Sequence, residues 1–255
     1  MKLGLLRFVY KGLLTGMPFL TYNILKQSTF NAPLDVKPYS TYLNFKLNSE
    51  HVDYLSNYIN KFTNNLTIVP IELYPNTPEE YILSVNIYNC TSPLFLNDEK
   101  EITRCEINTY VKDKNNNYGT LIVDYLSNEI SMDPVNVIKF KDNIKFQNAD
   151  IYKIIDCKSI MENIDLKLNF TTIYDFDNKI SDKLVRYTDR VFYKNGIMDK
   201  VYYDSTLTDA KVKSPYIFNN LTFNYKGLNF TELDSIFYFT NKLNFIGGMW
   251  ANIFD

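Results

Sequence analysis

The feature that most limits the fold of this chain is a series of strand-like runs separated by short turns. Two clear examples are Glu79–Asn89 and Phe218–Tyr225, which are rich in the Ile, Val, Tyr and Phe that strands favour. Asn195-Gly196 lies between two further runs and is a type I′ hairpin dipeptide. Such patterns predict roughly ten strands and two or three helices. Nucleotide-binding α/β folds are excluded, because βαβ alternation and the G-x-G-x-x-G and Walker A sequences are absent.

A hairpin and a helix are the best defined of the predicted elements. Thr103–Tyr125 reads as two strands around the turn "DKNNNYG", and Asn48–Phe62 carries Val52, Leu55, Ile59 and Phe62 at helical spacing. Further strands are predicted within Leu66–Tyr74, Leu166–Phe176, Lys183–Ser205 and Ser235–Phe245. We therefore expect a β-rich α+β fold, in which an antiparallel sheet curls or closes into a barrel with a few peripheral helices.

The first 34 residues form a segment of different character, and residues 35–255 are expected to form a single domain. No acidic residue precedes Asp35, and Leu6, Val9, Leu13 and Met17 recur at helical spacing. No apolar run reaches the length of a transmembrane helix. We favour an amphipathic helix that packs on the domain. The alternatives are a membrane-surface helix over residues 3–25 and a cleaved organellar presequence.

Charge and cysteine content exclude several classes of function. The net charge is -2, from 27 Lys and Arg against 29 Asp and Glu, which is unlike a nucleic-acid-binding protein. Cys90, Cys105 and Cys157 form no C-x-x-C pair, and His51 is the one histidine. Neither a metal site nor a cofactor is expected. The cysteines are interpreted as buried thiols in a reducing, intracellular compartment.

The first strand of the predicted hairpin has polar residues at every second position. Successive strand side chains point to opposite faces, so one face carries Arg104, Glu106, Asn108 and Tyr110, and the other Cys105, Ile107, Thr109 and Val111. The second face is suited to a core. The first face either meets water or points inward, where Glu106 requires a cation such as Arg104. An interior pair of this kind would orient a small carbonyl or carboxylate ligand.

Two lysines extend this hypothesis toward catalysis. Lys139 and Lys141 alternate with Ile138 and Phe140, and a lysine with a lowered pKa forms Schiff bases. The alternative is an edge strand whose lysines discourage aggregation.

Residues 52–146 resemble the first half of the acetoacetate decarboxylase-like superfamily. The similarity lies in the order of a helix, "FTNNLTIVPIELY", "YILSVNIYNC", "RCEINTYV", a turn and "GTLIVDYLSNEISMDPVNVIKFK". It implies a barrel around a cavity, with Glu106 as the cavity glutamate and Lys139 or Lys141 near the Schiff-base lysine. The aromatic-Pro-Lys-Lys run of the decarboxylases is replaced here by Phe140-Lys141-Asp142-Asn143. An Asp beside Lys141 favours the charged amine.

These observations lead to two expectations of function. The first is a small-molecule-binding protein, with Arg104, Asn108 and Tyr110 at the ligand. Whether it is an enzyme is left open; a decarboxylase-like lyase acting on a small keto acid would use Lys141, Lys139 and Glu106. The second is a non-catalytic structural or assembly protein attached to a membrane surface through residues 3–25. Homo-oligomerisation is compatible with both.

Overall fold

A computed structural model describes a β-rich molecule. The described residues are 32–37, 40–91, 101–130, 141–148, 153–160, 163–171, 175–176, 180–188, 190–193, 196–199, 202–203, 211–213, 217–239, 243–247 and 250–251. The predicted amino-terminal helix and Lys139 lie outside them.

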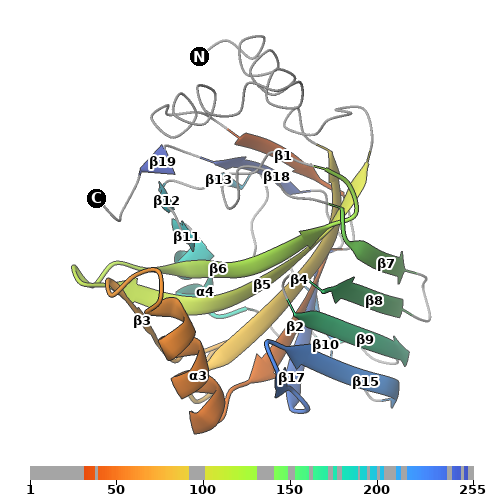
Figure 1. The fold of residues 1–255 in the computed structure, drawn as a ribbon, viewed down its shortest axis with the longest axis horizontal. Helices are drawn as coiled ribbons and strands as arrows, with labels where there is room; N and C mark the ends of the chain where they lie inside the picture. The colour runs from red at the N-terminus through yellow and green to blue at the C-terminus, as the bar shows by residue number, and fades with distance from the viewer. Residues whose placement is uncertain are drawn as a thin grey trace.

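The larger of two sheets has 14 strands. Its main path runs β10 (Asp175–Phe176), β14 (Lys211–Lys213), β17 (Leu233–Phe239), β2 (Ser40–Lys46), β4 (Ile82–Thr91), β5 (Ile102–Asp113), β6 (Tyr118–Ser127), β11 (Arg190–Tyr193), β12 (Gly196–Asp199) and β19 (Trp250–Ala251). Off this path, β1 (Ala32–Val36) pairs with β4 and β18 (Leu243–Gly247), β13 (Tyr202–Tyr203) with β18, and β3 (Leu66–Ile68) with β5. The long strands β2, β4, β5 and β6 cross the molecule side by side (Figure 1).

The smaller sheet has five antiparallel strands, in the order β16 (Leu228–Asn229), β15 (Ile217–Tyr225), β9 (Ile164–Thr171), β8 (Lys153–Ser159) and β7 (Asn143–Asn148). It lies to the right of the larger sheet in Figure 1. The two described helices are α3 (Ser49–Ile59), next to β3, and α4 (Asp182–Thr188), which packs on β6 and β11.

The main core lies between the two sheets. Cys105, Ile107 and Val111 of β5 are fully buried in a cluster that also contains Leu166 and Phe223 of the smaller sheet. Cys157 of β8 joins the same cluster, so two of the three cysteines meet where the sheets pack. All three cysteines are buried and free, as predicted.

The β-rich α+β class is confirmed, but a closed antiparallel barrel is wrong for the described part of the chain, where neither sheet closes. The sheet is also mixed, because Val191–Tyr193 of β11 pair in parallel with Thr120–Ile122 of β6. Parallel neighbours need a long crossover connection. Here the chain between β6 and β11 forms β7, β8, β9, β10 and α4, and β7, β8 and β9 belong to the smaller sheet.

The local predictions fared unequally. The helix over Asn48–Phe62 is confirmed as α3, in which Leu55 and Ile59 are buried and the side chain of Asn48 caps the first turn. The β5–β6 hairpin and the pairing of β11 with β12 are also confirmed. The strand predicted to start at Lys183 is wrong there, because α4 occupies that stretch. Its start is favoured by Ser181, whose hydroxyl accepts a hydrogen bond from the Lys183 N–H at 3.0 Å. The run Ser235–Phe245 divides between β17 and β18.

Candidate functional site

The face of β4 and β5 that points away from the main core carries a buried group of polar side chains, here called the polar layer. Its residues are neighbours in register across β2, β4, β5 and β6. Ser84 of β4 lies between Asn44 of β2 and Asn108 of β5, and Glu106 of β5 lies between Asn86 of β4 and Tyr125 of β6. Tyr88 of β4 lies opposite Arg104 of β5. Tyr110 continues the same face of β5. Arg104, Asn108 and Tyr110 are each 4% exposed and Glu106 is 9% exposed. The predicted row of polar residues therefore points inward, and the interpretation as a solvent face is wrong.

An ion pair occupies the centre of the polar layer. Arg104 Nη2 lies 3.1 Å from Glu106 Oε1, and the Tyr88 hydroxyl donates to the same carboxylate oxygen at 2.6 Å. The guanidinium carbon lies 4.7 Å from the centre of the Tyr125 ring and 5.8 Å from that of Tyr88. Burial raises the pKa of Tyr88 well above its ordinary value, so its hydroxyl stays protonated and remains a donor. The two charges thus compensate each other within the pair.

A chain of weaker hydrogen bonds occupies one end of the layer. The Ser84 hydroxyl donates to Asn44 Oδ1 at 2.6 Å, and Asn44 Nδ2 donates to the Ser235 hydroxyl at 3.3 Å. The Tyr110 hydroxyl lies 3.3 Å from Ser84 Oγ. Burial raises the pKa of Tyr110 to about 12. These contacts hold the side chains of β2, β4, β5 and β17 in fixed positions.

Two amide oxygens in the polar layer are left without a hydrogen-bond donor. Asn86 Oδ1 and Asn108 Oδ1 are buried, and neither has a partner within the described part of the chain. Asn86 opposes Glu106 and Asn108 opposes Ser84, so the two amides are diagonal neighbours across β4 and β5. Diagonal residues lie about 7–8 Å apart, within reach of one small molecule. Buried acceptors of this kind call for a bound donor, since an unmade hydrogen bond is costly.

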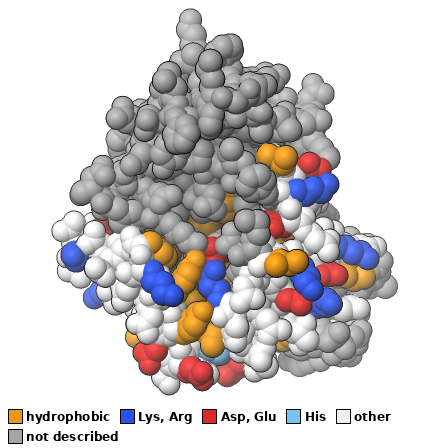
Figure 2. Space-filling view, viewed as in Figure 1, with side chains coloured by type: hydrophobic (Ala, Val, Ile, Leu, Met, Phe, Trp, Pro, Cys, Tyr) orange, Lys and Arg blue, Asp and Glu red, His pale blue; other side chains and the backbone are white. Residues whose placement is uncertain are grey.

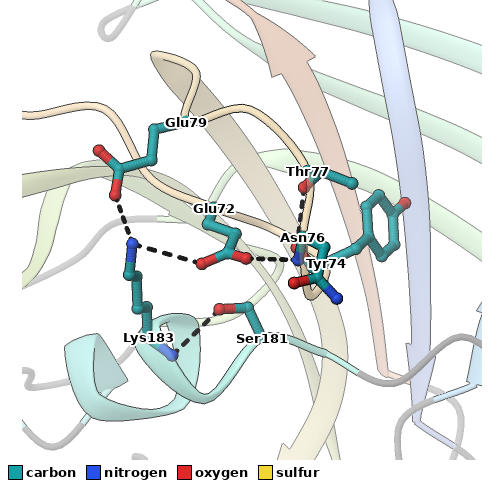
Figure 3. A network of polar contacts seen from close by, with 7 residues as sticks. All are labelled: Glu72, Tyr74, Asn76, Thr77, Glu79, Ser181 and Lys183. Atoms are coloured by element: carbon teal, nitrogen blue, oxygen red, sulfur yellow. Dashed lines mark hydrogen bonds and ion pairs between the residues drawn. The ribbon is translucent and has the colours of Figure 1, made fainter.

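The helix α4 packs against one end of the layer. Leu184 shares a buried cluster with Tyr88 and Tyr110, and the Tyr187 ring lies 5.7 Å from the ring of Tyr110, centre to centre. A network on the outside fixes the helix (Figure 3): Lys183 Nζ lies 2.6 Å from Glu79 and 3.4 Å from Glu72. Glu72 also accepts the Asn76 backbone N–H at 2.6 Å. The segment between β3 and β4 is thereby tied to α4.

The predicted lysines do not join the polar layer in the described structure. Lys141 has a side chain that is 66% exposed and lies 3.8 Å from Glu129. Its neighbour Asp142 is held to the end of β6, donating its N–H to the Ser127 carbonyl at 2.7 Å. Lys139 lies outside the described residues. The glutamate and the ligand residues of the sequence hypothesis are therefore brought together, and Lys141 is placed at the surface.

Sequence reasoning missed the part of the layer that β4 and β6 supply. Ser84, Asn86 and Tyr88 repeat in "ILSVNIYN" at every second position, the same signal that singled out Arg104 and Glu106. Asn44 lies in a similar alternation of Ser40, Tyr42, Asn44 and Lys46, whereas Tyr125 has no such signal. Polar residues at every second position in two consecutive strands were therefore the sequence signal that could have identified the layer.

Other kinds of site find little support in the described residues. No group of three or more His, Cys, Asp or Glu side chains there is arranged to hold a metal ion. Among the described helices, none is long and apolar enough to cross a membrane. On the face drawn in Figure 2, basic and acidic side chains are interspersed, unlike the single-sign field of a nucleic-acid surface.

Comparison with known proteins gives no assignment. No protein-family model matches the chain, and no curated protein matches it. The polar layer is therefore the main indication of function.

Proposed function

We propose that the protein binds a small polar organic molecule at the polar layer. The observation that carries this proposal is the pair of buried, unpartnered oxygens of Asn86 and Asn108, beside the Arg104–Glu106 ion pair. A bound molecule with hydrogen-bond donors would satisfy both oxygens.

The composition of the layer supports a binding role over a purely structural one. A buried ion pair is expensive to desolvate, and apolar residues of similar volume are often equally stabilising. The opposite face of the same strands is built in that apolar way, with Val85, Ile87 and Ile107 fully buried. The concentration of polar groups on one of the two faces is the pattern expected where function, and not stability, selects the residues.

The proposal stops at binding. Schiff-base catalysis, which the resemblance to the decarboxylases implies, needs an amine at the ligand. Lys141 is exposed and ion-paired with Glu129, and Lys139 lies outside the described residues. A lyase activity is therefore a prediction of the resemblance alone.

A fragment screen tests the proposal. Ligand-observed NMR with a set of small amides, alcohols and ketones is expected to find binders to the native protein. Asn86→Leu/Asn108→Leu removes both acceptors at similar volume and is expected to abolish that binding while the protein stays folded. Asn224→Leu, at an exposed position of β15, is the matched control and should bind normally. Absence of any binder, or full binding by the double variant, would refute the proposal.

A further inference from the structure

The charges of the polar layer are already balanced, and this bears on the ligand. Within the described residues the layer has one cation, Arg104, and one anion, Glu106, and they are in contact at 3.1 Å. Tyr88 and Tyr110 are neutral phenols, because burial raises the pKa of each. The remaining members carry hydroxyl or amide groups, so the formal charge of the layer is zero.

A carboxylate ligand would disturb this balance. The Arg104 charge is compensated by Glu106 and faces the rings of Tyr125 and Tyr88. An added anion would be buried beside Glu106 without a cation of its own, and burying an uncompensated charge is strongly unfavourable. A neutral molecule incurs no such cost.

The amide oxygens that lack a hydrogen-bond donor indicate which groups the ligand must carry. The two amide oxygens without a hydrogen-bond partner, Asn86 Oδ1 and Asn108 Oδ1, are acceptors, and their residues are 6% and 4% exposed. A ligand that satisfies them must present N–H or O–H groups, and a carboxylate has none. A primary amide has two N–H donors on one nitrogen, which suits two acceptors on diagonal neighbours.

We propose that the polar layer selects an electrically neutral ligand with N–H or O–H donors, of the primary-amide type, against the carboxylate of the same shape. This inference rests on the proposed binding function and narrows its ligand class. It replaces the keto acid that the sequence suggested.

Isosteric pairs of probes test the selection. Acetamide is compared with acetate, and propionamide with propionate, by ligand-observed NMR titration of the native protein at neutral pH. The amide of each pair is expected to bind at least about tenfold more tightly, the ratio that 1.4 kcal/mol produces. Equal or tighter binding of the carboxylates would overturn this inference and leave the binding function standing. Failure of both probe classes, and of the wider fragment set, would remove the binding function and this inference with it.

A second, independent test removes the Glu106 carboxylate, so that the layer should now favour an anionic ligand. Glu106→Ala leaves Arg104 buried without its carboxylate, so acetate is expected to raise the melting temperature of this variant at constant ionic strength. The native protein and the double variant Arg104→Met/Glu106→Ala should show no acetate effect. If Glu106→Ala does not fold, Glu106→Gln is used in the same comparison. Absence of acetate stabilisation in the folded variant, or the same stabilisation of the native protein, would show that Arg104 and Glu106 do not set the charge balance of the layer.

Discussion

At the residue scale, each buried carboxylate on the two faces of the β5–β6 hairpin is held by a cation and a tyrosine. Glu106 in the polar layer contacts Arg104 and accepts from Tyr88. Asp124 on the opposite face is 1% exposed; it accepts from the Tyr225 hydroxyl at 2.6 Å and lies 2.8 Å from Lys226 Nζ. A phenol donor supplies a short hydrogen bond without adding charge. The same arrangement of a carboxylate with a cation and a tyrosine hydroxyl therefore occurs on the polar face and on the mainly apolar face.

The first prediction concerns the hydroxyl of Tyr88. Tyr88→Phe leaves the Glu106 carboxylate short of a 2.6 Å hydrogen bond in a buried site, and the free energy of unfolding should fall by about 2 kcal/mol. Tyr110→Phe is the control, since its 3.3 Å contact is with a neutral Ser84 that also bonds Asn44. Its cost should be about 1 kcal/mol or less. Urea unfolding at pH 7 measures both, and a larger loss for Tyr110→Phe would contradict the account of the layer.

Single residues were predictable from the sequence only where the chain itself supplies the neighbour. Arg104 and Glu106 are two positions apart on one strand, so their ion pair could be anticipated. The pairing of Asp124 with Tyr225 joins positions 101 residues apart and depends on how the two sheets pack. No local pattern contains that information. The exposure of Lys141 was likewise unpredictable, since it follows from the approach of residues 141–142 to Ser127 at the end of β6.

At the element scale, the turn of the β5–β6 hairpin is organised by one carboxylate. Asp113 accepts the N–H groups of Asn115 and Asn117 at 2.8 Å and the side-chain amide of Asn117 at 2.8 Å. Asn116 takes a positive φ of 59°, which asparagine tolerates better than most residues. The run of asparagines therefore has a structural reason, as the sequence indicated.

The second prediction follows from the pKa of Asp113. Burial alone would raise this pKa, but the hydrogen bonds from Asn117 and Asn115 outweigh it, and the pKa lies below the ordinary 3.8. The carboxylate therefore stabilises the fold above pH 3.8 and loses that effect as the pH falls through its folded pKa. Asp113→Ala should cost about 1 kcal/mol at pH 7, and the difference from the native protein should shrink on acidification. Lys114→Ala, at an exposed position of the same turn, is the control, and a pH-independent difference for Asp113→Ala would contradict the mechanism.

The third prediction concerns Gly119, which the sequence suggested as a turn residue. In the structure it lies within β6, and a Cβ there would come within 2.6 Å of the Arg190 carbonyl oxygen and 2.7 Å of the Phe192 ring. Glycine is needed because β11 approaches closely, and Gly119→Ala should force β11 away at a cost of about 1–3 kcal/mol. Urea unfolding and faster amide exchange in Val191–Tyr193 are the measurements.

The control for Gly119 is Gly227, in the turn between β15 and β16. It has a φ of +87° and no atom within 4 Å of an added Cβ. Gly227→Asn should have a small effect, because asparagine accepts a positive φ and the space is open. Similar losses for the two variants would show that the close approach of β11 is not what requires glycine at position 119.

At the scale of the whole molecule, the sequence predicted the individual strands and hairpins better than the way in which they pair into sheets. Strand-forming runs and hairpin turns predicted the pairing of β5 with β6 and of β11 with β12, because those partners are adjacent in the chain. The parallel pairing of β6 with β11 and the departure of β7, β8 and β9 into a second sheet were not predictable, since hydrophobic periodicity identifies a strand but not its neighbour. A curled sheet was the simplest arrangement to expect from those hairpins. The structure instead has two sheets, which pack against each other around Cys105 and Cys157.

The fourth prediction is a loss of global stability in alkali. Burial raises the pKa of Tyr110 from 10.0 to about 12 and that of Tyr88 well above 10.0. Burial lowers the pKa of Lys226, but the charge and hydrogen bond of Asp124 outweigh it, and the net pKa is raised above 10.5. A group with a raised folded pKa stabilises the protein fully below its unfolded pKa and loses that contribution as the pH rises toward the folded value. The free energy of unfolding should therefore be steady near neutrality and fall above pH 10.

The size of this alkaline loss can be assigned to one tyrosine. A shift of about two units at fully buried Tyr110 corresponds to roughly 2–3 kcal/mol between pH 10 and pH 12. Tyr110→Phe has no ionisable group at that position, so its unfolding free energy should fall less steeply over this interval. Exposed Tyr54 provides the matched control as Tyr54→Phe, which should leave the native slope unchanged. Urea unfolding at increasing pH, with tyrosinate absorbance recorded alongside, gives both slopes, and an unchanged slope for Tyr110→Phe would mean that this phenol is not shielded from water as the polar layer requires.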